Sequence, residues 1–191
     1  WQFLQLCFEW NEVVIKGVEK FWKVPIGCDS TASGLQLLSA MRRDPVGMKY
    51  ANLLPPETDS SPPLDAYTRV LEVVKDEIKG DPSRQYLMKY LGFRSIGKPA
   101  LMFSIYGGSA DNIKRSIKDA LLEEGISVDN QTASELQKLL LKASKSVFPA
   151  AYEALSWLKK LARTAHQSGA TSLTWKLPTG DLINLYKYKL N

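Results

Sequence analysis

Two basic residues and a tyrosine in the middle of this sequence are spaced four and then eight positions apart. The pattern is Arg94-x3-Lys98-x7-Tyr106-Gly107. In an α-helix, side chains at i, i+4 and i+12 lie along one slowly drifting stripe about 18 Å long. Cations at one end of such a stripe suit phosphates, and a phenol at the other end suits a sugar and a base. The spacing therefore predicts a site for a nucleoside triphosphate and polymerase-like chemistry.

Two residues, Pro99 and Gly108, break the regularity of the expected helix. A proline has no N–H to bond the carbonyl four residues earlier, so the pattern also allows a helix that begins at Pro99, with Arg94 and Lys98 in the turn before it. Gly108 directly follows Gly107, and we expect this pair to loosen the end of the helix. Neither residue removes a side chain that the predicted site needs.

A single carboxylate, Asp29, follows a short apolar run upstream of the stripe. Residues 23–28 read Lys-Val-Pro-Ile-Gly-Cys, which favours a strand that ends just before Asp29. A helix is expected from Gly34 to Arg43, with Ser33 as its N-cap and Asp44-Pro45 as its end. Alone, Asp29 is typical of a turn or a cap. Together with the basic stripe, it becomes a candidate metal ligand.

These two segments resemble motifs A and B of the single-subunit RNA polymerases, the phage, mitochondrial and plastid enzymes that transcribe DNA with one chain. The resemblance covers nearly the whole sequence and is weakest over residues 59–89 and 111–134. Further short matches occur in the family's order: Cys7-Phe8-Glu9, Gly34-Leu35-Gln36, Ser39-Ala40-Met41, Arg43-Asp44, Asn52-Leu53-Leu54-Pro55 and Glu153-Ala154-Leu155-Ser156-Trp157-Leu158-Lys159.

The resemblance implies a metal-dependent reaction at motif A. In that family the matching aspartate, here Asp29, is catalytic and binds two magnesium ions together with a second aspartate, and the next residue, here Ser30, contributes its carbonyl oxygen. Hard oxygen ligands of this kind suit Mg²⁺. One ion assists attack by the RNA 3′-hydroxyl on the α-phosphorus, and the other neutralises the leaving pyrophosphate. The implied reaction is template-dependent transfer of a ribonucleoside monophosphate from NTP to RNA.

Motif B implies the residues that bind the nucleotide. Arg94 and Lys98 match the pair that binds the triphosphate, and Lys98 also counts as catalytic. Tyr106, the other catalytic match, helps to select ribonucleotides over deoxyribonucleotides, and Gly107 lets the template backbone approach. The implied partners are a DNA template, nascent RNA and ribonucleoside triphosphates. We expect a monomer without membrane contact, in the cytoplasm of an infected bacterium if the source is a phage, or otherwise in a mitochondrion or plastid. A compact loop after Asn52-Leu53-Leu54-Pro55 favours the phage.

Two alternatives remain. Family A DNA polymerases share the motif B skeleton but place an aromatic residue where this sequence has Met102, and they continue motif A with Tyr-Ser-Gln-Ile-Glu where this sequence has Ser-Thr-Ala-Ser-Gly after Asp29. Both differences favour ribonucleotides. The other alternative is a helical nucleic-acid-binding module without catalysis.

The second catalytic aspartate of the family belongs to a His-Asp motif, and these 191 residues contain no His-Asp pair. His166, the single histidine, precedes a glutamine and is expected at the solvent-facing end of a helix. Asp181 is expected in a hairpin turn. The sequence also begins at Trp1 and lacks the family's amino-terminal domain and thumb. We therefore expect a fragment that is inactive by itself.

Composition and periodicity predict a mostly helical α+β fold. The hydrophobic fraction of 45% and the charged fraction of 24% exclude a disordered or collagen-like chain. A net charge of +5 suits a surface that faces nucleic-acid phosphates, without requiring one. The proline-rich segment 55–63 suggests a domain boundary. The resemblance implies that it separates a partial palm with motif A (1–57) from fingers with motif B and a terminal β-hairpin (58–191). Helices are expected over 2–14, 65–79, 112–124, 132–147 and 150–166, and the hairpin over 172–190.

Overall fold

The structure, a computed structural model, describes residues 2–18, 32–56, 58 and 60–186. It forms two compact units, Trp1–Ser30 and Thr31–Asn191. In the first unit, α1 (Gln2–Trp10) continues directly into a π-helical turn, η1 (Asn11–Ile15), which confirms the helix predicted there apart from its π-helical end. The predicted strand over residues 23–28, with Asp29 and Ser30 after it, lies outside the described residues.

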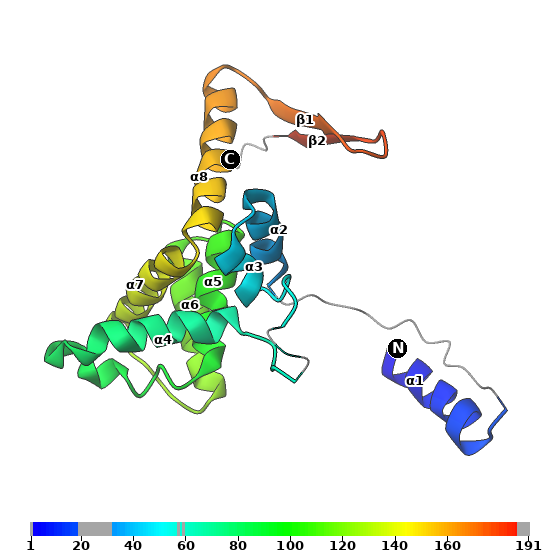
Figure 1. Ribbon diagram of the computed structural model, residues 1–191, viewed down its shortest axis with the longest axis horizontal. Helices are drawn as coiled ribbons and strands as arrows, with labels where there is room; N and C mark the ends of the chain where they lie inside the picture. The colour runs from blue at the N-terminus through cyan, green and yellow to red at the C-terminus, as the bar shows by residue number, and fades with distance from the viewer. Residues whose placement is uncertain (1, 19–31, 57, 59, 187–191) are drawn as a thin grey trace. The chain divides into compact units, whose positions relative to one another are not determined.

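The second unit is built mainly of helices and ends in a two-stranded antiparallel sheet (Figure 1). This arrangement confirms the mostly helical α+β fold and the hairpin. The strands pair so that Leu173 lies opposite Leu185. The elements are α2 (Ser33–Arg42), α3 (Pro45–Tyr50), α4 (Ala66–Lys79), the 3-10 helix η2 (Pro82–Leu87), α5 (Arg94–Ile105), α6 (Ala110–Glu123), α7 (Asn130–Val147), α8 (Pro149–Gln167), β1 (Ser172–Lys176) and β2 (Leu182–Tyr186).

The core of the second unit surrounds α5, which contacts α4, α6 and α7. Each of these helices carries apolar residues at intervals of three and four, so one side of each helix is buried. Burial of one such side chain contributes about 1.5–3 kcal/mol. The core therefore fixes α5 from several sides and leaves only its outer face exposed. Fully buried members are Val70, Val74, Ile78, Ile96, Leu101, Ile117, Leu121, Leu136 and Leu140.

A glycine allows α5 to lie very close to α4. A Cβ atom on Gly97 would come within 3.0 Å of the carbonyl oxygen of Tyr67 and 3.4 Å of Cγ of Leu71. The first of these neighbours is backbone and cannot rotate away. The contact therefore sets the position of the neighbouring turn of α5, which carries Lys98.

The helix α5 begins at Arg94 and runs through Pro99, so the alternative in which the helix begins at the proline is wrong. Pro99 is the sixth of the twelve residues of α5, so its missing N–H removes one backbone hydrogen bond inside the helix, the one to the carbonyl of Ser95. The helix nevertheless continues to Ile105. Arg94 and Lys98 are therefore held at helical spacing.

The two glycines after Tyr106 close α5, and the expectation that they loosen it is wrong. Gly107 has a φ of +80°, its N–H donates to the carbonyl of Ser104 at 3.3 Å, and the N–H of Gly108 donates to the carbonyl of Phe103 at 2.6 Å. These two bonds form a Schellman motif, which ends a helix with a left-handed residue. The helix thus stops at a defined point directly after Tyr106.

The start of α2 differs from the prediction by one residue. Its N-cap is Ala32, with a φ of +52°, and Ser33 is already the first helical residue, so the assignment of Ser33 as N-cap is wrong. The end agrees with the prediction, because Asp44 accepts a hydrogen bond from the N–H of Val46 at 3.1 Å and starts α3. The hydroxyl of Ser33 is therefore available for a contact outside its own helix.

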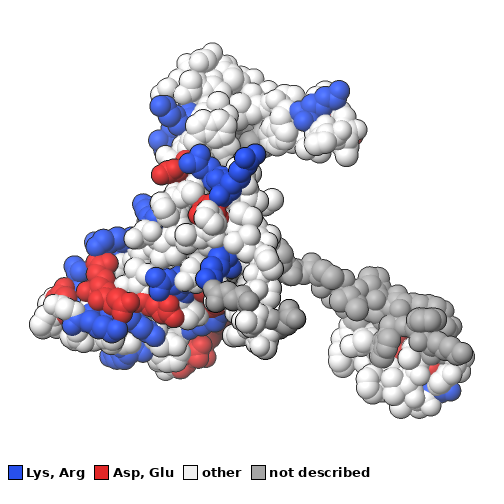
Figure 2. Space-filling model, in the orientation of Figure 1, with Lys and Arg blue, Asp and Glu red and all other residues white. Residues whose placement is uncertain are grey.

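Charged side chains are mixed over much of the second unit. Figure 2 shows basic and acidic side chains side by side in the region of α4. Many of them form surface ion pairs, for example Lys79 with Asp76 at 2.7 Å and Lys142 with Glu77 at 2.6 Å. Exposed pairs of this kind add little stability. They show where the surface charge is balanced locally.

Candidate nucleotide-binding site

The outer face of α5 carries the stripe that the sequence predicts. Arg94 is the first residue of the helix, Lys98 follows one turn later, and Tyr106 is the C-cap. All three side chains are exposed, with Tyr106 at 58%. At 1.5 Å per residue, the stripe is about 18 Å long. The structure thus places two cations and one phenol along a single exposed surface.

Arg94 is oriented by Asp65, which lies just before α4. Its Nε donates to Oδ2 of Asp65 at 2.7 Å and its Nη2 donates to Oδ1 at 2.9 Å. The guanidinium carbon lies 4.8 Å from the centre of the Tyr67 ring. A bidentate pair uses only some of the N–H donors of a guanidinium, so the others stay available for a second anion. Arg94 is therefore held in place and still able to bind a phosphate.

Asp65 serves two helices at once. Besides binding Arg94, it caps α4 by accepting hydrogen bonds from the N–H of Thr68 at 3.2 Å and from the Thr68 hydroxyl at 2.6 Å. Partial burial alone would raise the pKa of Asp65, but the hydrogen bonds from Arg94 and Thr68 outweigh it and hold that pKa below its ordinary value. The bond to Asp65 in turn raises the pKa of Arg94. The pair is ionised at neutral pH.

We expect Asp65→Asn to reduce the loss of stability in acid. The folded-state pKa of Asp65 lies below its unfolded value, so its stabilisation is present above about pH 4 and is lost as the pH falls through the lower folded value. Asparagine caps helices as well as aspartate but carries no charge. Urea unfolding followed by circular dichroism from neutral to acidic pH measures the effect. Asp119→Asn, at an exposed position of α6, is the control. An unchanged acid dependence in Asp65→Asn would contradict the assignment.

Lys98 is the second cation of the stripe. Its side chain is exposed, and within the described part of the chain no hydrogen bond or ion pair engages its ammonium group. An ammonium is a compact charge with several donors, which suits a phosphate oxygen. Lys98 therefore offers its full charge to a ligand, whereas the charge of Arg94 is partly balanced by Asp65.

The start of α2 anchors the other end of the stripe. The hydroxyl of Tyr106 lies 2.8 Å from Oγ of Ser33 and accepts a hydrogen bond from the N–H of Gly34 at 3.2 Å. A Cβ atom on Gly34 would come within 2.8 Å of Cγ2 of Ile105 and 3.1 Å of Cε1 of Tyr106. The glycine thus allows the first turn of α2 to touch the end of α5. The contacts of its hydroxyl with Ser33 and Gly34 therefore fix the orientation of the Tyr106 ring, although most of the side chain is exposed.

α8 supports the same end of α5 from another direction. The hydroxyl of Tyr152 lies 2.5 Å from Oγ of Ser104. Burial raises the pKa of Tyr152. This contact and those of Tyr106 and Asp65 were not predicted from the sequence, because each joins residues between 29 and 73 positions apart. The one local signal was at Asp65, which is followed three residues later by Thr68, a spacing typical of an N-cap.

The candidate metal ligands Asp29 and Ser30 lie outside the described residues. In the described ranges, no three His, Cys, Asp or Glu side chains gather where they could hold a metal ion. The stripe therefore supplies cations and a phenol.

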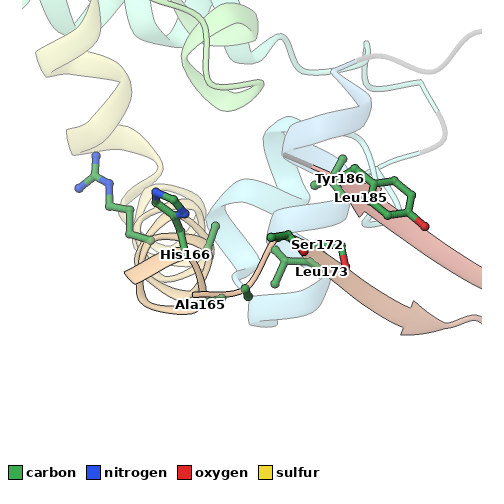
Figure 3. A pocket seen from close by; sticks show the side chains of 10 residues that line it. Ala165, His166, Ser172, Leu173, Leu185 and Tyr186 are labelled. Carbon is green, nitrogen blue, oxygen red and sulfur yellow. The ribbon is translucent and has the colours of Figure 1, made fainter. Parts of the chain in front are cut away.

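Apart from the stripe, a concavity of about 340 Å³ lies between the end of α8 and the hairpin (Figure 3). Its lining is mostly apolar, with Leu173 and Leu185 from the strands, and includes no Asp, Glu or Cys among the described residues. His166 borders it, exposed in the last turn of α8 as expected. Asp181 lies in the hairpin turn, also as expected, where its carbonyl accepts a hydrogen bond from the N–H of Leu177 at 2.8 Å.

Comparison with known proteins decides the family. A family model for DNA-dependent RNA polymerase matches residues 1–184. The chain belongs to the single-subunit RNA polymerase family. This confirms the resemblance of the two motifs. No described helix of this family member has the length and apolar character to cross a membrane.

Polymerases of phages and of plant organelles are among its relatives. The DNA-directed RNA polymerase of Pseudomonas phage phiKMV is 32% identical over 167 residues, which cover 80% of this chain and 20% of that protein. The enzyme of Enterobacteria phage T3 is 29% identical over 194 residues, covering 84% and 22%. The mitochondrial DNA-directed RNA polymerase 1 of Arabidopsis thaliana is 29% identical over 171 residues, covering 82% and 17%. The chain thus spans about a fifth of the length of these polymerases.

Proposed function

We propose that the protein containing this chain is a DNA-directed RNA polymerase and that α5 binds its incoming ribonucleoside triphosphate. The outer face of α5 carries this proposal, with Arg94 and Lys98 at one end and the anchored phenol of Tyr106 at the other. Residues 1–57 would belong to the palm and 58–191 to the fingers. The enzyme would act as a monomer in a phage-infected bacterium or in an organelle.

Each end of α5 has a separate task. Arg94 and Lys98 bind the phosphates, where positioning and charge neutralisation account for most of the catalysis of phosphoryl transfer. Tyr106 faces the sugar and base, and its ring is kept in one orientation by the hydrogen bonds of its hydroxyl. Gly107 leaves the surface beside that ring open, because among the described residues only Cε of Lys159, at 4.0 Å, lies near the place of its missing Cβ. A template strand can approach there.

Asp29 and Ser30 would hold magnesium, with a second aspartate completing the site. When bound, two such ions supply charge stabilisation to the attacking and leaving oxygens. In the sequence, Ser33 and Gly34 follow Asp29 by four and five positions. With one such carboxylate and no His-Asp pair in its sequence, the 191-residue chain is expected to make no RNA by itself.

Tyr106→Phe is expected to reduce the preference of the intact protein for ribonucleotides over deoxyribonucleotides by roughly two- to tenfold, the value of one hydrogen bond. The variant keeps the ring and removes the hydroxyl that Ser33 and Gly34 hold. Primer extension on a DNA template, with each type of nucleotide in turn, measures the ratio. Tyr86→Phe is a matched control, because the Tyr86 hydroxyl binds Glu135 away from the stripe.

Two results of this experiment would count against the proposal. An unchanged ratio in Tyr106→Phe would remove the role of the hydroxyl in sugar selection. A preference of the unaltered protein for deoxyribonucleotides would favour a DNA polymerase instead.

A further inference from the structure

Two short helices, α2 and α3, pack closely against each other (Figure 1). A Cβ atom on Gly47 of α3 would come within 2.1 Å of Oγ of Ser39, a fully buried residue of α2. The side-chain amide of Gln36 in α2 donates to the carbonyl of Ala51, the C-cap of α3, at 2.8 Å. The chain therefore leaves this pair of helices at a fixed point, directly before Asn52.

The side chain of Asn52 bonds both backbone groups of Leu64, which lies 12 positions later. Its Nδ2 donates to the carbonyl of Leu64 at 2.8 Å, and its Oδ1 accepts a hydrogen bond from the N–H of Leu64 at 2.9 Å. Asn52 has a φ of +55°, a conformation that asparagine adopts more readily than most other residues with a side chain. Asn52 thus joins the two ends of the proline-rich segment.

Leu64 directly precedes Asp65, the carboxylate that orients Arg94. The position of one residue's backbone limits that of the next, so the two bonds from Asn52 help to fix where Asp65 lies. Asp65 then holds the guanidinium of Arg94 through bonds of 2.7 and 2.9 Å. A continuous series of hydrogen bonds and one peptide link therefore leads from the end of α3 to the phosphate end of the stripe.

The same pair of helices also contacts the other end of the stripe. Ser33 and Gly34, in the first turn of α2, bond the hydroxyl of Tyr106 directly. The tyrosine is thus oriented by α2 itself, and Arg94 is oriented through Asn52 at the end of α3. Both ends of a nucleotide lying along α5 would therefore be positioned relative to one rigid pair of helices.

We infer that Asn52 is a positioning residue for Arg94 and holds its guanidinium toward the phosphates of the nucleotide by way of Leu64 and Asp65. The inference rests on the proposed function, because Asn52 carries no charge and its amide oxygen and nitrogen both bond Leu64. Its effect on triphosphates therefore passes through Arg94 and disappears when Arg94 is removed. A residue that bound the phosphates itself would act with or without Arg94.

The test is Asn52→Gly in the intact protein, measured by equilibrium binding of a fluorescent ribonucleoside triphosphate. Glycine adopts the left-handed conformation freely, so the substitution removes the two hydrogen bonds without straining the backbone. We expect triphosphates to bind roughly two- to tenfold more weakly, the value of one hydrogen bond, and nucleosides to bind as before. In a protein that already carries Arg94→Ala, Asn52→Gly should cause no further loss, because residues that act through one another are non-additive.

Two other variants separate positioning from a general loosening of the segment. Ser61→Ala is the matched control, since the Ser61 hydroxyl bonds the N–H of Thr58 at 3.2 Å and the Thr58 hydroxyl at 2.7 Å, within the same segment. It should leave the affinity for triphosphates unchanged. Asn52→Asp keeps the acceptor for the N–H of Leu64 and loses only the donor. It should weaken triphosphates about twofold, which keeps the inference testable if Asn52→Gly does not fold.

Three outcomes would overturn the inference and leave the proposed function standing. The first is an unchanged triphosphate affinity in the Asn52 variants when Arg94→Ala lowers it. The second is an equal loss from Asn52→Gly with and without Arg94, which would mean that Asn52 acts by another route. The third is an equal loss for nucleosides, or in Ser61→Ala, which would indicate general loosening. If Arg94→Ala itself left triphosphate binding unchanged, the proposed phosphate site would fail, and the inference with it.

Discussion

Asp29→Asn is expected to lower RNA synthesis by the intact protein about 10³-fold or more, with no change in its fold. Asparagine has nearly the size of aspartate but no negative charge, so it binds magnesium weakly. Metal ions contribute several kcal/mol to the stabilisation of charge in such a reaction, and each 1.4 kcal/mol is about a factor of ten in rate. Incorporation of ribonucleotides on a primed DNA template measures the loss. Chelation of magnesium should abolish the activity of the unaltered protein as well.

Asp181→Asn is the matched control for this substitution. Its carboxylate accepts a hydrogen bond from the Thr179 hydroxyl at 2.7 Å within the hairpin turn, and an asparagine oxygen can accept the same bond. RNA synthesis should therefore be retained. If Asp29→Asn also left synthesis undiminished, the catalytic assignment of motif A would be wrong. A non-catalytic nucleic-acid-binding module would then be the better interpretation of this chain.

The helices and the hairpin could be predicted because their signals are local. Asp65 precedes a run of apolar residues at helical spacing, and the structure places it as the N-cap of α4. The stripe from Arg94 to Tyr106 depends only on helical periodicity, and Pro99 was the one point at which two helix starts were possible. The helix continues through that proline, whose missing N–H removes a single backbone hydrogen bond.

The contacts that orient the stripe could not be predicted, because they join distant parts of the chain. Asp65 binds Arg94 across 29 positions, and Ser33 meets Tyr106 across 73. The same distance effect explains the error at Ser33, whose side chain has the chemistry of an N-cap but bonds to another helix. At Gly108 the error was of another kind. A loose helix end was expected there because glycine is conformationally permissive, whereas the N–H of Gly108 completes a hydrogen-bonded helix end.

Replacing Arg94 and Lys98 together by alanine is expected to weaken the binding of ribonucleoside triphosphates about 10²-fold or more, while the affinity for nucleosides stays within about twofold of that of the unaltered protein. The loss of hydrogen bonds between charged partners accounts for a difference of this size. Nucleosides have no phosphates, so they make no such bonds and their binding is unaffected. Equilibrium binding of fluorescent triphosphates, with unlabelled nucleosides as competitors, measures both affinities. Lys75→Ala combined with Lys138→Ala removes the same charge elsewhere and should change neither. Equal loss for both ligands would contradict the phosphate assignment.

The ion pair between Arg94 and Asp65 allows a further test of the phosphate assignment. Arg94→Ala alone leaves the Asp65 carboxylate without its guanidinium partner at the phosphate end of the stripe, where a bare negative charge repels a triphosphate. Adding Asp65→Asn should therefore restore several-fold of the lost affinity, because asparagine keeps the cap of α4 and removes the charge. The two substitutions should thus be non-additive, as expected for residues in contact. Strict additivity would mean that the triphosphate lies away from Arg94, and only Lys98 would remain as its ligand on α5.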